Sequence, residues 1–184
     1  RRADMPTHAP AAGGAPAARP LPHLPRAAAN GLAFRHIDDA DMGFLSALYA
    51  ATRAEEVAPL PWSDAQKAAF LDQQFQAQHA HYMEHYPDAD WLIAERDGAP
   101  AGRLYLERWP SEIRVIDIAL MPEMRGQGLG RAMMEDVIAL AGADGLGVGI
   151  HVEKNNPAMR LYERLGFTPR EDKGVYWLMR RDAD

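Results

Sequence analysis

The chain has 184 residues, of which 47% are hydrophobic and 25% charged, proportions typical of a single globular domain. Its net charge of −6 argues against a nucleic-acid-binding protein, because such proteins usually carry a basic surface. The sequence has no cysteine and no apolar stretch long enough for a membrane span, which excludes disulfides, thiolate metal sites and a transmembrane segment. A cytoplasmic location fits this composition.

Residues 1–31 differ from the rest of the chain, because they consist mainly of alanine, proline, glycine and arginine. A segment with so few large apolar side chains cannot offset the entropy that is lost when it becomes ordered. We therefore predict a disordered leader or linker over 1–31, dispensable for stability, and a folded domain over 32–184. The sequence begins at Arg1 rather than at methionine, so a fragment of a longer protein is one interpretation.

Cap and turn residues divide the remaining chain into helices and strands. Asp38 or Asp39 can cap one helix and Ser63 the next, because their side-chain oxygens can accept hydrogen bonds from amides left free in the first turn. The pair Asp97-Gly98 between two apolar segments is typical of a tight hairpin. In chain order, the sequence predicts a strand over 32–36, helices over 40–52 and 63–86, strands over 91–95, 102–107 and 113–120, a helix over 129–141, a strand over 146–152, a helix over 157–165, and strands over 167–170 and 175–179. This order indicates a mixed α/β (α+β) fold.

A glycine-rich loop follows the strand 113–120 and opens the helix 129–141; its residues are Arg125, Gly126, Gln127, Gly128, Leu129, Gly130 and Arg131. Its alternating glycines lack Cβ atoms, so a ligand can approach the backbone closely. The first-turn amides of the helix have no partner within it, and they point toward the loop with the positive end of the helix dipole. This arrangement can bind a phosphate or pyrophosphate without a lysine. A dinucleotide-binding fingerprint is excluded because Arg131 stands where its third glycine should be, and no P-loop motif occurs.

A second motif lies downstream, from Asn155 to Phe167. It combines an asparagine, a short helix carrying Leu161 and Tyr162, and a Gly-Phe pair. The two motifs in this order resemble those of the GNAT superfamily of acyl-CoA-dependent N-acetyltransferases, and the resemblance covers residues 32–181. It implies a GNAT-like acyl-CoA N-acyltransferase fold, in which helices flank a mostly antiparallel central sheet, and an N-acetyltransferase domain over 32–184.

The resemblance implies a site for acetyl-CoA as cosubstrate, and no metal. In the family, the pantetheine arm lies along the strand end that residues 118–120 match, and the pyrophosphate lies on the amides of residues 127–131. Asn156, or Asn155 beside it, matches a polar contact to the cofactor arm. The implied cofactor-binding residues are Ile118, Ala119, Leu120, Arg125, Gly126, Gln127, Gly128, Leu129, Gly130, Arg131 and Asn156.

Tyr162 matches the family tyrosine that lies near the thioester sulfur. A phenol has a pKa near ~10 and is protonated at neutral pH, so it can donate a proton to the departing thiolate. The resemblance therefore implies acetyl transfer to a primary amine by direct attack in a ternary complex, with Tyr162 as catalytic acid. The incoming amine must be neutral, and Asp117, Glu56 and His151 are the candidates for its general base.

The acceptor amine is not identified by the sequence: a small amine, an amino acid, a peptide N-terminus and a protein lysine all stay open. No nucleic acid or membrane partner is expected, and a homodimer stays open. In the family, a helix at this position walls the acceptor pocket, so the resemblance implies that the helix 63–86 and the segment 53–62 do so here. Trp62, Phe75, His79, Tyr82 and Tyr86 would give this wall an aromatic surface, and plain core packing stays open for Leu71 and Phe75.

Two alternative functions are compatible with parts of the sequence. A non-catalytic acyl-CoA-binding module would use the same fold but would not need Tyr162. A zinc peptidase would use the pattern His81-x-x-Glu84-His85, in which two histidines share one helical face. No third ligand can be identified, so we predict that this pattern holds no metal.

Overall fold

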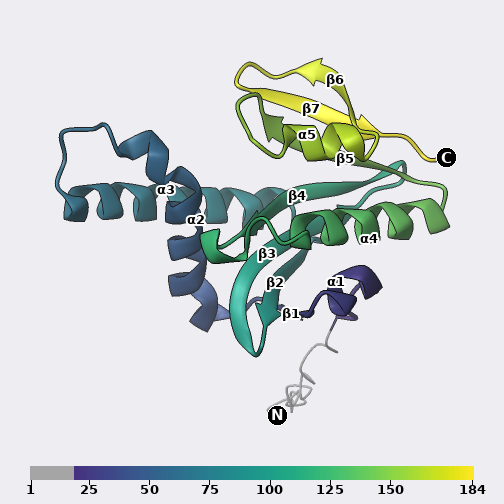
Figure 1. The fold of residues 1–184 in the computed structure, drawn as a ribbon, viewed down its shortest axis with the longest axis horizontal. Coiled ribbons are helices and arrows are strands. Elements are labelled where there is room, and N and C mark those ends of the chain that lie inside the picture. Colours follow the sequence, from purple (N-terminus) through teal and green to yellow (C-terminus); the bar gives the residue numbers. More distant parts are fainter. Residues whose placement is uncertain (1–18) are drawn as a thin grey trace, which may run out of the picture.

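The computed structural model describes residues 19–184, which form a seven-stranded sheet with helices on both faces (Figure 1). The strand order is β1-β2-β3-β4-β5-β7-β6, and every neighbouring pair is antiparallel except β4 and β5. The strands are β1 Leu32–His36, β2 Asp90–Arg96, β3 Ala99–Arg108, β4 Glu112–Leu120, β5 Gly147–Glu153, β6 Thr168–Asp172 and β7 Tyr176–Arg181. The helices are α1 Pro25–Ala29, α2 Met42–Val57, α3 Asp64–His85, α4 Leu129–Ala143 and α5 Met159–Arg164, with short 3-10 helices at Asp39–Asp41 and Pro122–Met124. The predicted mixed fold with a mostly antiparallel sheet is confirmed.

Each face of the sheet packs against its own set of helices. On one face, Met133 of α4 and Tyr162 of α5 join the apolar residues of the central strands. On the other face, Leu45 of α2 and Phe75 of α3 belong to a second apolar cluster. None of the helices in residues 19–184 has the length and hydrophobicity needed to cross a membrane. The two clusters hold the sheet between two layers of helices.

β4 and β5 separate halfway along β4. Their parallel pairing ends at Val115 and Ile150. Toward β3 the register shifts at the same point, because Ile116 has no partner there and forms a β-bulge. A bulge bends its strand and increases the local twist. Beyond Val115, β4 therefore diverges from β5, and the backbone of residues 116–120 faces a split in the sheet.

The N-terminal boundary of the folded part differs from the prediction. The first part of the predicted leader, residues 1–18, lies outside the described residues. Its last part is ordered, since α1 forms there and buries Leu24 and Ala27 in the core beside α4. The average composition of residues 1–31 does not reveal that these two apolar side chains are buried. Ordered packing thus begins before residue 32.

α2 is longer than predicted. The sequence indicated a helix that ends near residue 52 with an irregular segment after it, but α2 continues to Val57. Arg53 and Glu56 form an ion pair of 2.9 Å across one turn of this extension. Two prolines follow the helix and prevent it from continuing. The extension places Arg53 on a rigid element close to the end of β5.

Candidate active site

The glycine-rich loop leads directly into the N-terminus of α4. Gly126 and Gly128 have φ angles of 72° and 78°, and Gly128 is the residue immediately before the helix. For residues with a Cβ atom, this left-handed region costs roughly 1–2 kcal/mol, so both positions favour glycine for conformational reasons. Open space surrounds the position of a Cβ atom at Gly126, Gly128 and Gly130 alike. The glycines therefore allow the backbone conformation of the loop and also leave space for a ligand to approach it.

The amides at the start of α4 are free. Within residues 19–184, the first amide of this helix with a backbone acceptor is that of Ala132, which donates to the Gly128 carbonyl at 3.0 Å. The amides of residues 126–131 donate to no carbonyl in that part of the chain. No side chain caps the helix, and its first turn has no acidic residue. Together with the positive helix end, these amides are suited to bind an anion such as a pyrophosphate.

Two side chains of the loop support its shape. Arg125 donates through Nε to the Leu120 carbonyl at 3.2 Å, which ties the loop back to the end of β4. Gln127 donates through Nε2 to the Glu123 carbonyl at 2.9 Å. Of the residues predicted to bind the cofactor, these two thus have structural contacts of their own, while the free anion-binding groups of the loop are backbone amides.

The strand end predicted to contact the pantetheine arm lies at the split. Residues 118–120 pair with β3 on one side and with no strand on the β5 side. Ile118 and Leu120 pack their side chains against the core that α4 covers, so it is the backbone edge that faces the split. Only the short 3-10 helix Pro122–Met124 separates this strand end from the glycine-rich loop, so the free backbone edge and the free amides lie on successive segments of the chain.

Tyr162 lies on α5 with only 5% of its surface exposed. Its ring packs edge-on against Phe167, with 6.0 Å between the ring centroids. Burial raises the pKa of the Tyr162 phenol, and the negative charge of Asp117 on β4 raises that pKa further. The phenol is therefore protonated throughout the neutral pH range, as the role of a hydrogen donor requires.

The two asparagines before α5 have different surroundings. Asn156 accepts a hydrogen bond through Oδ1 from the Ala158 amide at 2.8 Å, which stabilises the turn that leads into α5. Asn155 lines a pocket beside the split. This hydrogen bond gives Asn156 a structural role, and its contact to the cofactor arm stays a prediction.

The three candidates for the general base occupy different places. Asp117 forms an ion pair with the buried Arg103 of β3. His151 is exposed, and its pKa is lowered by loss of solvation and by the charge of Arg114, whose guanidinium lies 3.4 Å from Nδ1. Glu56 lines the pocket beside the split. The structure therefore brings Glu56 to the pocket, keeps Asp117 close enough to influence Tyr162, and leaves His151 outside the pocket.

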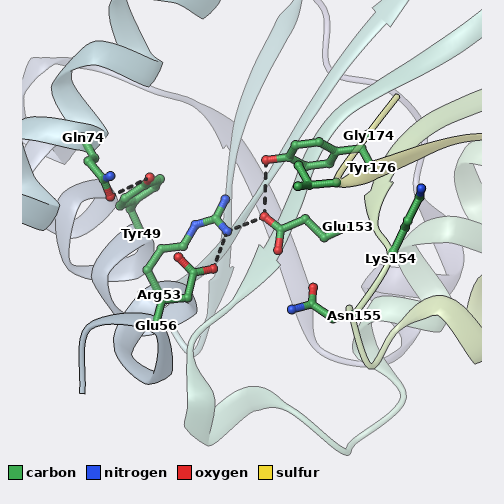
Figure 2. Close-up of a pocket in the computed structure, with 10 residues that line it drawn as sticks. Tyr49, Arg53, Glu56, Gln74, Glu153, Lys154, Asn155, Gly174 and Tyr176 are labelled. Carbon is green, nitrogen blue, oxygen red and sulfur yellow. Dashed lines mark hydrogen bonds and ion pairs between the residues drawn. The ribbon is translucent and has the colours of Figure 1, made fainter. Parts of the chain in front are cut away.

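The pocket measures about 700 Å³ and opens between α2, the end of β5 and the β6–β7 hairpin (Figure 2). Arg53 of α2 reaches across it to Glu153, the last residue of β5, and also contacts Glu56 at 2.9 Å. Glu153 accepts a second hydrogen bond from the Tyr176 hydroxyl at 3.3 Å. Tyr49 adds a second phenol to the lining. The pocket thus offers two carboxylates, one guanidinium, the ammonium of Lys154 and two phenols to a polar ligand.

Reasoning from the sequence missed Glu153 and Tyr176. No motif marks either residue, although Glu153 could have been assigned to the face of β5 opposite the buried Val152 by alternation along the strand. The predicted pocket wall agrees in part, because Arg53 and Glu56 of the segment 53–62 line the pocket, and they do so from α2 together with Tyr49. From α3, Gln74 lines the pocket, whereas Phe75 is fully buried in the core.

The two histidines of the peptidase-like pattern form a stacked pair. The rings of His81 and His85 have centroids 4.1 Å apart, and Nδ1 of His85 lies 2.9 Å from the His81 carbonyl oxygen. Among residues 19–184, no group of three or more potential ligands is arranged to hold a metal ion. A zinc site would need a further ligand, so the absence of metal from this pair stays our prediction.

Comparison with known proteins identifies similar sequences and folds. A family model described as "Acetyltransferase (GNAT) family" matches residues 48–167. A protein of Bacillus subtilis (strain 168), provisionally named as a ribosomal protein bS18-alanine N-acetyltransferase, is 32% identical over 92 residues. This match spans 48% of the chain and 60% of the Bacillus protein, which is less than two thirds of that relative.

Two solved structures share the fold. The PaiA N-acetyltransferase from Thermoplasma acidophilum, crystallised with coenzyme A, superposes with a TM-score of 0.63 at 15% identity over 82% of this chain and 98% of its own. The ribosomal-protein-S18-alanine N-acetyltransferase from Escherichia coli superposes with a TM-score of 0.54 at 21% identity over 83% of this chain and 94% of its own. At these identities the likeness is one of fold.

Proposed function

Because this chain belongs to the acetyltransferase (GNAT) family, we propose that it transfers an acetyl group from acetyl-CoA to a primary amine by direct attack in a ternary complex. One combination of features carries the proposal: free amides at the start of α4, a backbone edge at residues 118–120 with no strand on the β5 side, and the buried phenol of Tyr162, whose pKa is raised by Asp117 of the same strand β4. A pyrophosphate, an extended amide-containing arm and a departing sulfur require these three features in turn.

Acetyl-CoA supplies an activated thioester, and residues of this chain would hold it. The amides of residues 127–131 would donate hydrogen bonds to the pyrophosphate, because they are free and lie at a positive helix end. The backbone edge of residues 118–120 would hydrogen-bond the pantetheine arm as an additional strand would. Both proposed contacts are made by backbone groups.

In the proposed reaction, the amine nitrogen forms a bond to the carbonyl carbon while the carbon–sulfur bond breaks. The amine gives up a proton to water or to a carboxylate of the pocket, and the sulfur receives a proton. Tyr162 donates a hydrogen bond to this sulfur, since its phenol is buried, protonated and close enough to Asp117 of β4 to respond to that charge. An ordinary thiol has a pKa of about 8.5, which is below that of the phenol, so the hydrogen bond stabilises the departing thiolate before any proton is transferred.

The proposal is tested by measuring thiol release from acetyl-CoA in the presence of a panel of primary amines. Two similar proteins are named for an alanine of a ribosomal protein, so the panel includes peptides that begin with alanine. We expect release that depends on the amine, and calorimetry should show that CoA binds. If CoA binds while no amine in the panel promotes thiol release, the chain is a non-catalytic acyl-CoA-binding module.

A further inference from the structure

One ion pair crosses the pocket beside the split. Arg53 of α2 contacts Glu153 at the end of β5, and their side chains are only 21% and 24% exposed (Figure 2). The same Nη1 atom of Arg53 also contacts Glu56, whose side chain is 55% exposed. α2 packs mainly on α3, β3 and β4, so this pair is not required to hold α2 in place. Its position in the pocket therefore points to a role in ligand binding.

The charges of this cluster do not balance. Arg53 carries one positive charge, whereas Glu56 and Glu153 together carry two negative charges. Lys154 also lines the pocket, and its ammonium pairs with Asp172 at 2.7 Å. With Asp172 included, the cluster has three carboxylates and two cations, so it carries one negative charge in excess, and a single cation would neutralise it.

We propose that Glu153 binds the ammonium group of the acceptor and that Arg53 occupies this position when no acceptor is bound. The acceptors are then cationic primary amines with no carboxylate next to the amine, such as a peptide N-terminus or an alkylamine. This inference deepens the proposed function and rests on it. It concerns binding of the amine, before the amine loses its proton.

The contacts of the cluster support this exchange. When an ammonium replaces Arg53 at Glu153, Arg53 keeps its contact with Glu56, so neither carboxylate is left without a cation. The Tyr176 hydroxyl continues to donate to Glu153 and fixes the carboxylate for the incoming donor. Burial and the charge of Glu153 raise the pKa of Tyr176, which keeps that hydroxyl protonated.

A carboxylate beside the amine would be disfavoured. A free amino acid would add a second negative charge to a pocket in which its ammonium has just restored neutrality. Its carboxylate could pair with Arg53 only by competing with Glu56, which holds that guanidinium at 2.9 Å, or with Lys154 only by competing with Asp172 at 2.7 Å. An amide or a peptide bond in the same place has no charge and avoids this conflict.

The test compares alanine with alaninamide, because the two carry the same ammonium and differ in the neighbouring carboxylate. Binding of each to the CoA-saturated full chain is measured by NMR titration, alongside thiol release from acetyl-CoA. Butylamine and an alanine-leading tripeptide amide distinguish the two sources, an alkylamine and a peptide N-terminus. We expect alaninamide to bind at least tenfold more tightly than alanine.

Variants of the full chain test whether Arg53 and Glu153 cause the selective binding of alaninamide. Glu153→Gln should weaken alaninamide binding at least tenfold while affinity for CoA stays unchanged, because it removes the charge and keeps a partner for Tyr176. Arg53→Met should strengthen binding, because it removes the competing cation. Glu55→Gln is the matched control, since it removes the same charge from an exposed neighbour on α2 outside the pocket.

Equal binding of alanine and alaninamide, no detectable binding of either, or an unchanged affinity in Glu153→Gln would each overturn the inference. Selective binding without turnover would leave it standing and would instead contradict the proposed acetyl transfer.

Discussion

Asp136, in the middle of α4, accepts a hydrogen bond from the backbone amide of Ala27 at 2.9 Å, across 109 residues of sequence. Its other carboxylate oxygen accepts from the Arg26 amide at 3.1 Å. Asp136 is 1% exposed, so these bonds lie inside the protein. A buried carboxylate on one helix thus caps another helix that begins at Pro25.

Replacing Asp136 with alanine should lower the free energy of unfolding by about 2–4 kcal/mol. The change leaves the buried amide of Ala27 and the partly buried amide of Arg26 without acceptors, and each such loss costs up to roughly 1–3 kcal/mol. Chemical denaturation measures the effect. Glu135→Ala is the matched control, because this neighbour makes only partly exposed ion pairs and its loss should cost less than ~1 kcal/mol.

Removal of residues 1–29 should also destabilise the protein, contrary to the expectation from composition that this segment is dispensable. The deletion takes Leu24 and Ala27 out of the core and exposes the surface of α4 that they cover. A melting temperature equal to that of the full chain would show that α1 adds nothing to stability.

In the glycine-rich loop, Gly128→Ala should weaken CoA binding at least tenfold in calorimetry. The methyl group strains a residue with φ of 78° and projects from a loop whose amides must approach the pyrophosphate. Gly142→Ala is the control, because it lies near the other end of α4 with open space around it. Unchanged affinity in a folded Gly128→Ala variant would contradict the assignment of the loop to the cofactor.

The sequence predicted the parts of this site that follow one another along the chain. The alternating glycines identify the loop from Arg125 to Arg131 in the sequence. The start of α4 was predicted at Leu129, the residue where it occurs. The pair of Arg53 and Glu153 could not be predicted in this way, because the two residues are 100 positions apart and meet only through the fold.

The glycine at position 149 of β5 is explained by a side chain of the neighbouring strand β4. A Cβ atom at Gly149 would lie 1.9 Å from Glu112 Oε2, so the Glu112 carboxylate fills the space beside this glycine. Glu112 is held there by Arg114 at 3.1 Å. An alternating pattern shows which face is apolar, and it cannot show which polar side chain from a neighbouring strand covers the other face.

Stability should fall as the pH drops below about 6.5, the ordinary pKa of histidine. Burial and the charge of Arg103 lower the pKa of His79, and loss of solvation lowers that of His151. A histidine with a lowered pKa in the folded state binds protons more readily when unfolded, so its contribution is present above pH ~6.5 and is lost as the pH falls through the folded-state value.

Thermal unfolding between pH 7.5 and 5 measures this dependence. His79→Phe keeps a ring against Phe75, from which the imidazole centroid lies 5.8 Å away, and removes the titrating group. Its melting temperature should therefore decline less than that of the wild type over the same range. An identical decline in the two proteins would assign the pH dependence to other groups.

The purified, untagged protein should contain no stoichiometric zinc. The rings of His81 and His85 stack on each other on α3, and a stable site would need a further ligand. Metal analysis checks this directly. Zinc present at one equivalent in the wild type and absent from the double variant His81→Ala, His85→Ala would show that the pair does bind metal.

Tyr162→Phe should lower kcat by roughly tenfold or more while the KM for acetyl-CoA changes little, provided that chemistry limits turnover. The substitution removes the donor to the sulfur and keeps the ring that packs edge-on against Phe167, so stability should stay close to that of the wild type. Since burial and the charge of Asp117 raise the pKa of Tyr162, the phenol stays protonated up to at least pH ~10, its ordinary pKa. The wild-type kcat should accordingly show no loss from ionisation of Tyr162 below that pH, and a pH–rate profile measured beside that of the Phe variant checks both points. Turnover of the Phe variant at the wild-type rate would mean that Tyr162 only packs α5 onto the sheet and that water provides the proton.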